Sequence, residues 1–104
     1  YLDALTWQNE IQNGDITFNQ EVDRVYQEVD GEIVLSDKNR TIHIKNDGSS
    51  SVVVWNPWIE KTLRMSGMKP NAYEYFVCIE SANAFDDARV LNPKEVHILG
   101  AVID

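Results

Sequence analysis

The chain has 104 residues, 43% of them hydrophobic, which is enough for one domain with a modest core. Nine Lys and Arg against seventeen Asp and Glu give a formal net charge of -8, and no basic run occurs, so nucleic acids and anionic membrane surfaces are poor partners. No apolar stretch is long enough to span a membrane, and the N-terminus lacks the apolar region of a signal peptide.

Alternation of apolar and polar residues, with a period of two, is the main pattern along the chain. Asn13-Gly14, Asp30-Gly31 and Asp47-Gly48 are flanked by such residues and predict tight hairpin turns. The predicted strands cover residues 16–26, 32–36, 41–45, 51–55, 75–80 and 95–103. Residues 58–65 favour one short helical turn and residues 66–71 a loop. The sequence therefore predicts an all-β fold, an antiparallel β-sandwich with one face buried.

No linker, low-complexity tract or repeat divides the chain, so residues 1–104 are expected to form a single β-sandwich unit. Residues 1–7 begin in an apolar pattern with no polar lead-in. About six strands also leave sheet edges that need pairing or cover. We therefore expect the chain to be part of a larger sandwich.

The stretch 51–61 joins a β-branched run to a sharp exit. The run ends at Trp55, and Pro57 offers no N–H to a ladder and restricts Asn56 to an extended or turn conformation. Two tryptophans and an asparagine thus lie where a strand meets a loop, a position at which binding residues concentrate. The alternative is that Trp55 and Trp58 are core side chains at a strand end.

Motifs for metals and nucleotides are missing: the chain has no Cys-x-x-Cys, no His-x-x-x-His and no glycine-rich phosphate loop, so no metal and no cofactor is expected. The single cysteine, Cys78, excludes an internal disulfide framework, reads as a small buried apolar residue and fits a cytoplasmic location. His43 and His97 are expected to be solvent-side strand residues. Asp86-Asp87 reads as a solvated acidic pair.

Glu80 differs from the other carboxylates because it ends an apolar strand. Burial there would disfavour the charged form and make the carboxylate a stronger base, suited to general base catalysis. The alternative is a strand-end carboxylate held by backbone donors.

Three segments together resemble a known family. The segments at 21–26 (EVDRVY), 53–61 (VVWNPWIEK) and 75–80 (YFVCIE) follow the order and spacing of the hexose-6-phosphate mutarotases, the glucose-6-phosphate 1-epimerases of the aldose 1-epimerase (galactose mutarotase-like) superfamily. The resemblance covers most of the chain but only about the C-terminal third of such an enzyme. It implies part of a galactose mutarotase-like supersandwich that interconverts the α and β anomers of a hexose 6-phosphate without a cofactor.

The resemblance also implies roles for individual residues. Glu80 matches the catalytic general base, and Asp23 matches the aspartate that contacts sugar hydroxyls. The Trp-Asn-Pro block makes Asn56 and Trp55 candidate substrate contacts. Arg24 follows Asp23 and should point to the opposite face of its strand, where it would support the sheet.

Two parts of such an enzyme lie outside the matching segments. The family's general acid is a histidine in an upstream motif that neither His43 nor His97 matches, and the arginines that hold the phosphate are also upstream. The partners implied are a hexose phosphate or sugar and the N-terminal portion of the same polypeptide, and this piece alone should be inactive. A non-catalytic carbohydrate-binding β-sandwich and a purely structural β domain are the alternatives.

Overall fold

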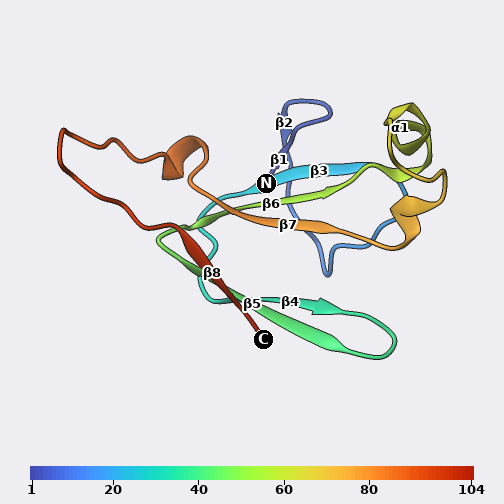
Figure 1. Ribbon diagram of the computed structural model, residues 1–104, viewed down its shortest axis with the longest axis horizontal. Coiled ribbons are helices and arrows are strands. Elements are labelled where there is room, and N and C mark those ends of the chain that lie inside the picture. Colours follow the sequence, from blue (N-terminus) through green and yellow to red (C-terminus); the bar gives the residue numbers. More distant parts are fainter. The chain divides into compact units, whose positions relative to one another are not determined.

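The computed structural model describes all 104 residues as eight short strands, one α-helix and two 3₁₀ turns (Figure 1). The strands are β1 (Leu2–Asp3), β2 (Gln8–Asn9), β3 (Val22–Tyr26), β4 (Glu32–Ser36), β5 (Thr41–Asp47), β6 (Ser51–Asn56), β7 (Cys78–Ala82) and β8 (Gly100–Ile103). The helix is α1 (Trp58–Arg64), and the 3₁₀ turns are η1 (Ala72–Glu74) and η2 (Phe85–Asp87).

The strands form two sheets, one with the order β2-β1-β3-β6-β7 and one with the order β4-β5-β8. Strand β1 pairs antiparallel with β2 and β3, and β5 pairs antiparallel with β4 and β8. The prediction of an all-β, antiparallel fold with one short helix is confirmed. The residues group into two compact units, a first unit of Tyr1–Tyr26 with Val53–Glu80 and a second unit of Gln27–Val52 with Ser81–Asp104.

The core of the first unit consists of valines on its two central strands. Val22, Val25 and Val54 are all at most 6% exposed. β-Branched side chains pack well on a pleated surface, which accounts for strands at these positions. Beside them the rings of Tyr1 and Tyr26 lie 5.1 Å apart, and the Arg24 guanidinium sits 4.7 Å from the Tyr1 ring centroid.

The second unit contains a β-hairpin made by β4 and β5. Their register runs from Glu32 opposite Lys45 to Ser36 opposite Thr41. Its turn is closed by the Asp37 N–H, which donates to the Arg40 carbonyl at 2.9 Å. Ile44 on β5 is the buried residue of this sheet, and β8 pairs with the other edge of β5.

The prediction that the three Asx-Gly pairs form hairpins was wrong. Gly14, Gly31 and Gly48 do have positive φ values, of 70°, 96° and 76°. However, β2 and β3 are not neighbours, and the strands flanking the other two pairs belong to different sheets. A left-handed glycine serves any sharp change of direction, whereas the true hairpin turn at 37–40 has none.

Other strand predictions differ in their extent. The long strands predicted at 16–26 and 95–103 shrink to β3 and β8, and the one at 75–80 moves to β7. His97 was predicted to be a solvent-side strand residue, but it lies outside any strand and is half-buried. Apolar alternation forms a strand only where a neighbouring strand supplies hydrogen bonds, and residues 88–99 have no such partner.

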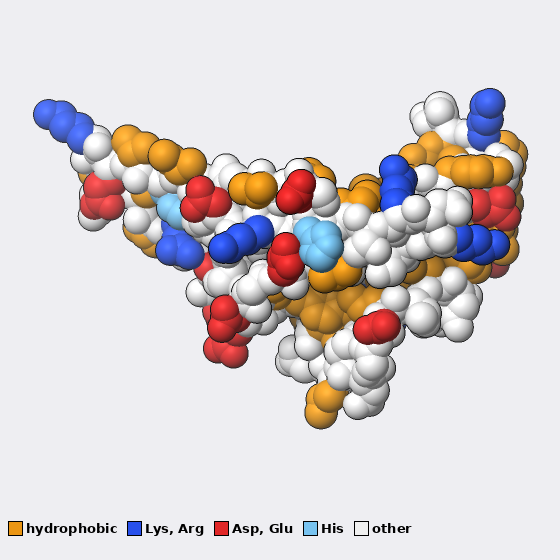
Figure 2. All heavy atoms as spheres, turned by 90° about the horizontal axis from the view of Figure 1, so that it is seen from below, with side chains coloured by type: hydrophobic (Ala, Val, Ile, Leu, Met, Phe, Trp, Pro, Cys, Tyr) orange, Lys and Arg blue, Asp and Glu red, His pale blue; other side chains and the backbone are white.

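The apolar surface is large relative to the core. Only five hydrophobic side chains are buried, whereas many large ones are open to solvent (Figure 2). In the second unit the exposed side chains include Val34, Phe85, Val90, Leu91, Val96, Ile98, Leu99, Val102 and Ile103. Isolated exposed apolar residues are common, whereas large contiguous apolar patches mark interaction surfaces.

Gly48 supports a prediction about stability. A Cβ atom at this position would lie 2.0 Å from the Ile98 carbonyl oxygen, whereas one at Gly14 would meet nothing within 4 Å. Both positions are left-handed, so we expect Gly14→Ala to cost about 1–2 kcal/mol and Gly48→Ala clearly more. Chemical denaturation of the two variants measures this difference. Equal losses would mean that the backbone at Ile98 moves away freely.

Candidate functional site

The strands that carry the predicted site residues are neighbours in one sheet. Asp23 lies on β3, Trp55 and Asn56 end β6, and Glu80 lies on β7. These three strands are consecutive in the five-stranded sheet, and all four residues belong to the first unit. The fold therefore gathers segments that are far apart in the sequence.

Glu80 differs from its prediction in position and exposure. It is the third residue of the five-residue β7 rather than a strand end, and its side chain is exposed rather than buried. Cys78, on the same face of β7, is half-buried; burial raises the pKa of its thiol, and the negative charge of Glu80 adds to this.

Trp55 is half-buried and forms an aromatic wall with Phe76. The two ring centroids lie 5.9 Å apart at an interplanar angle of 50°. The ammonium of Lys61 lies 5.8 Å from the Trp55 ring and 3.5 Å from a Glu21 carboxylate oxygen. Lys61 is thus engaged by a carboxylate and an indole rather than fully solvated.

Asn56 is 3% exposed, and backbone groups engage its carboxamide. Its Nδ2 donates to the carbonyl oxygens of Tyr73 at 3.0 Å and Phe76 at 2.8 Å, and its Oδ1 accepts the Trp58 N–H at 2.9 Å. Both amide hydrogens are used. A direct contact of Asn56 with sugar stays a prediction, and this geometry favours an indirect role.

Asp23 is half-buried in the centre of the sheet. Its carbonyl oxygen accepts the Ala4 N–H at 2.8 Å, which fixes β3 against the chain that follows β1. Along β3, Asp23 shares a face with Val25, whereas Arg24 points to the opposite face with Tyr26. The Tyr26 hydroxyl and Arg24 both donate to Gln12 Oε1, at 2.8 and 3.5 Å, which anchors that opposite face.

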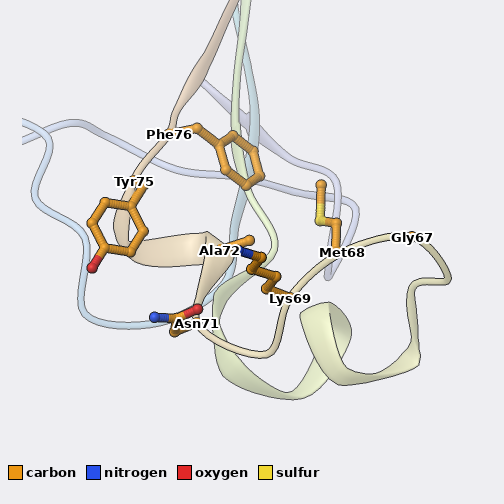
Figure 3. Close-up of a pocket in the computed structure, with 7 residues that line it drawn as sticks. All are labelled: Gly67, Met68, Lys69, Asn71, Ala72, Tyr75 and Phe76. Carbon is orange, nitrogen blue, oxygen red and sulfur yellow. The ribbon is translucent and has the colours of Figure 1, made fainter.

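Two hollows lie in the first unit, close to the Trp-Asn-Pro block. The larger, about 510 Å³, is lined by Gly67, Met68, Lys69, Asn71, Ala72, Tyr75 and Phe76 (Figure 3). The Phe76 side chain lines this hollow and also packs against Trp55, whereas the Tyr75 side chain points in a different direction. The smaller, about 350 Å³, is lined by Glu21, Pro57, Trp58, Ile59 and Glu60. Residues 66–71 were predicted only as a loop, and the larger hollow was not predicted. The adjacent aromatic residues Tyr75 and Phe76 were the sequence feature that could have indicated it.

Asp87 was predicted to belong to a solvated acidic pair, and that prediction was wrong. It is 8% exposed and accepts hydrogen bonds from the backbone and hydroxyl of Ser50 (2.8 Å each), from the backbone and hydroxyl of Ser51 (3.2 Å each) and from Asn83 Nδ2 (3.1 Å). Arg89 Nη2 lies 2.9 Å away. These donors, led by the Ser50 N–H, hold the pKa of Asp87 well below its usual range. The carboxylate is saturated, so it ties loops together rather than awaiting a ligand.

The histidines and acidic residues do not form a metal site. His43 is exposed on β5 as predicted, 3.2 Å from a Glu32 carboxylate oxygen, and His97 Nε2 lies 3.0 Å from Asn83 Oδ1. No group of three or more His, Cys, Asp or Glu side chains is arranged to hold a metal ion.

No helix here combines the length and the apolar character that crossing a bilayer requires.

Comparison with known proteins identifies the family. The model of the aldose 1-epimerase family matches residues 2–101, and the chain belongs to this family. A protein of Escherichia coli K12 is 31% identical over 91% of this chain and 33% of its own length. One of Cenchrus ciliaris is 34% identical over 91% of this chain and 30% of its own length, and both are named "Putative glucose-6-phosphate 1-epimerase". The chain thus spans about a third of the length of these relatives. No solved structure matches significantly.

Asp87 supports a prediction about acid stability. Its pKa in the folded chain lies below the ordinary value of 3.8, so its stabilisation is complete above that value and is lost as the pH falls from about 4. We expect Asp87→Asn to lower the melting temperature by several degrees at pH 7 and to flatten its decline in acid.

The exposed neighbour Asp86 provides the matched control, since Asp86→Asn removes the same charge without a buried network. Melting curves recorded between about pH 7 and pH 2 compare the two variants. Identical curves for both would show that the Asp87 hydrogen bonds contribute nothing to stability.

Proposed function

We propose that this chain supplies the general base and part of the sugar site of an enzyme that interconverts the α and β anomers of a hexose 6-phosphate. The observation that carries the proposal is the adjacency of β3, β6 and β7, which assembles Asp23, Trp55 and Glu80 in one unit of a chain of the aldose 1-epimerase family. The names of the relatives support a phosphorylated hexose as the substrate.

The reaction needs one base and one acid. The Glu80 carboxylate takes the proton of the anomeric hydroxyl, and the O–H electron pair forms the C1 carbonyl while the C1–O5 bond breaks. The electron pair of that bond goes to the ring oxygen, which takes a proton from an acid. Rotation about C1–C2 and the reverse steps give either anomer. Base catalysis of this kind contributes roughly 10²–10⁴-fold.

The residue types suit these tasks. A hexose presents hydroxyls at its edge and C–H groups on its face, so it needs hydrogen-bond acceptors and an apolar wall. Asp23 supplies a carboxylate acceptor, and the packed rings of Trp55 and Phe76 supply a wall. Cys78 and Glu80 lie on one face of β7, and Phe76 lies two residues before that strand, so the wall and the candidate base are close along the chain.

The rest of the active site belongs, in this proposal, to the remaining part of a polypeptide about three times as long. That part would supply the acid and the phosphate clamp, and it would cover the exposed apolar side chains of the chain described here. It would also cover Glu80, whose side chain is exposed here.

Glu80→Gln in the full polypeptide tests the base. The amide cannot accept the anomeric proton, so we expect kcat for mutarotation of glucose 6-phosphate to fall by roughly 10²–10⁴-fold while the substrate still binds. Exchange NMR between the two anomers, corrected for the spontaneous rate, measures kcat. A rate for Glu80→Gln equal to that of the wild type would refute the proposal. If the wild-type polypeptide itself binds the sugar but does not catalyse mutarotation, a carbohydrate-binding module is favoured instead.

Asp23→Asn tests the sugar contact. Loss of a charge-assisted hydrogen bond should raise KM by roughly 10-fold or more, with a smaller change in kcat. Arg24→Gln is the matched control, because the adjacent side chain points to the other face and packs on Tyr1. We expect that control to lower stability and leave KM unchanged. An unchanged KM in Asp23→Asn would remove this residue from the site.

A further inference from the structure

Asn56 is the buried polar side chain that connects the most parts of the candidate site. We propose that it is a positioning residue: its carboxamide fixes the entry to β7, and through it Glu80, while it holds the turn that follows Trp55. The inference rests on the proposed function, because it assigns Glu80 as the group being positioned. It differs from the sequence-based prediction, in which Asn56 touches the sugar.

The first part of the argument is the link to β7. The Nδ2 group of Asn56 donates to two carbonyl oxygens, those of Tyr73 in η1 and Phe76, which lie 17 and 20 residues further along the chain. Phe76 lies two residues before β7 and four before Glu80. Two hydrogen bonds from one planar amide thus fix the position and direction of the backbone that delivers the base.

The second part is the link to the start of α1. Trp58 has a φ of 57°, a left-handed conformation that is costly for a residue other than glycine and persists only where the surroundings enforce it. Its N–H donates to Asn56 Oδ1, and its ring packs 4.9 Å from the ring of Tyr73. Tyr73 is therefore held twice, through its carbonyl by Asn56 and through its ring by Trp58.

The third part is the chemistry of the side chain. An amide offers two donors and one acceptor, and all three are engaged here. Aspartate has nearly the same shape and keeps the acceptor for Trp58, but it donates nothing and sets a negative charge against two carbonyl oxygens. The substitution Asn56→Asp therefore breaks the link to β7 while it retains the link to α1.

The test compares Asn56→Asp with Asn19→Asp in the full polypeptide. Asn19 is exposed, lies in the same unit and makes no side-chain hydrogen bond. The substitution Asn19→Asp is therefore a matched control, because it adds the same charge without breaking a hydrogen bond. We expect Asn56→Asp to lower kcat per folded molecule by roughly 10- to 100-fold with KM nearly unchanged, a loss typical of a misplaced catalytic group.

Hydrogen exchange gives a readout that does not depend on activity. Amides of residues 77–80 should exchange faster in Asn56→Asp, whereas those of the β4–β5 hairpin should not, because the opening is local. Asn19→Asp should match the wild type in both measurements. If Asn56→Asp does not fold, Asn56→Ala removes the same link without an added charge and is judged by the same criteria.

Three outcomes would overturn the inference. Wild-type kcat in folded Asn56→Asp would show that the link to β7 is dispensable, and a rise in KM alone would indicate a direct sugar contact. A loss of kcat without faster exchange at residues 77–80 would exclude positioning as the cause. Glu80→Gln, assayed in parallel, separates the two proposals. If Glu80→Gln keeps the wild-type rate, both the proposed function and this inference are refuted. If Glu80→Gln loses activity while Asn56→Asp keeps the wild-type kcat, only this inference is refuted.

Discussion

The structure depends on how the two ends of β6 are hydrogen-bonded. At its start, Ser51 is held in the network around Asp87, and at its end Asn56 bonds to three backbone groups. Between them, Val52 and Val54 supply buried apolar surface. A buried polar group is costly unless it is hydrogen-bonded, so each end of β6 is stabilised only while these hydrogen bonds are formed.

This constraint explains why the Trp-Asn-Pro block has its composition. Pro57 cannot donate to a ladder, so β6 must stop, and Asn56 then binds the segments that come next in the chain. Trp55 packs against Phe76, and α1 begins at Trp58, directly after the turn. One buried amide thus bonds both to the turn that follows Trp55 and to the segment that leads into β7, the strand that carries the candidate base.

Local patterns predicted the strands that pair well. Residues 32–36 were placed correctly because their alternation matches a hairpin with a buried Ile44 opposite Ile33. The Asx-Gly pairs failed because positive φ reports a change of direction and not the identity of the next neighbour. The exposure of Glu80 and the burial of Asp87 were also predicted wrongly. Asp87 is buried by contacts with residues more than thirty positions away in the sequence, and Glu80 is exposed because it lacks such contacts.

Strand β8 has a consequence for how copies of this chain behave in solution. It is an edge strand, paired on one side with β5, and its Val102 and Ile103 side chains are 62% and 71% exposed. An apolar edge with free N–H and C=O groups is a template for intermolecular pairing. Copies of this chain at high concentration should therefore associate through β8, and charged substitutions on that edge should weaken the association.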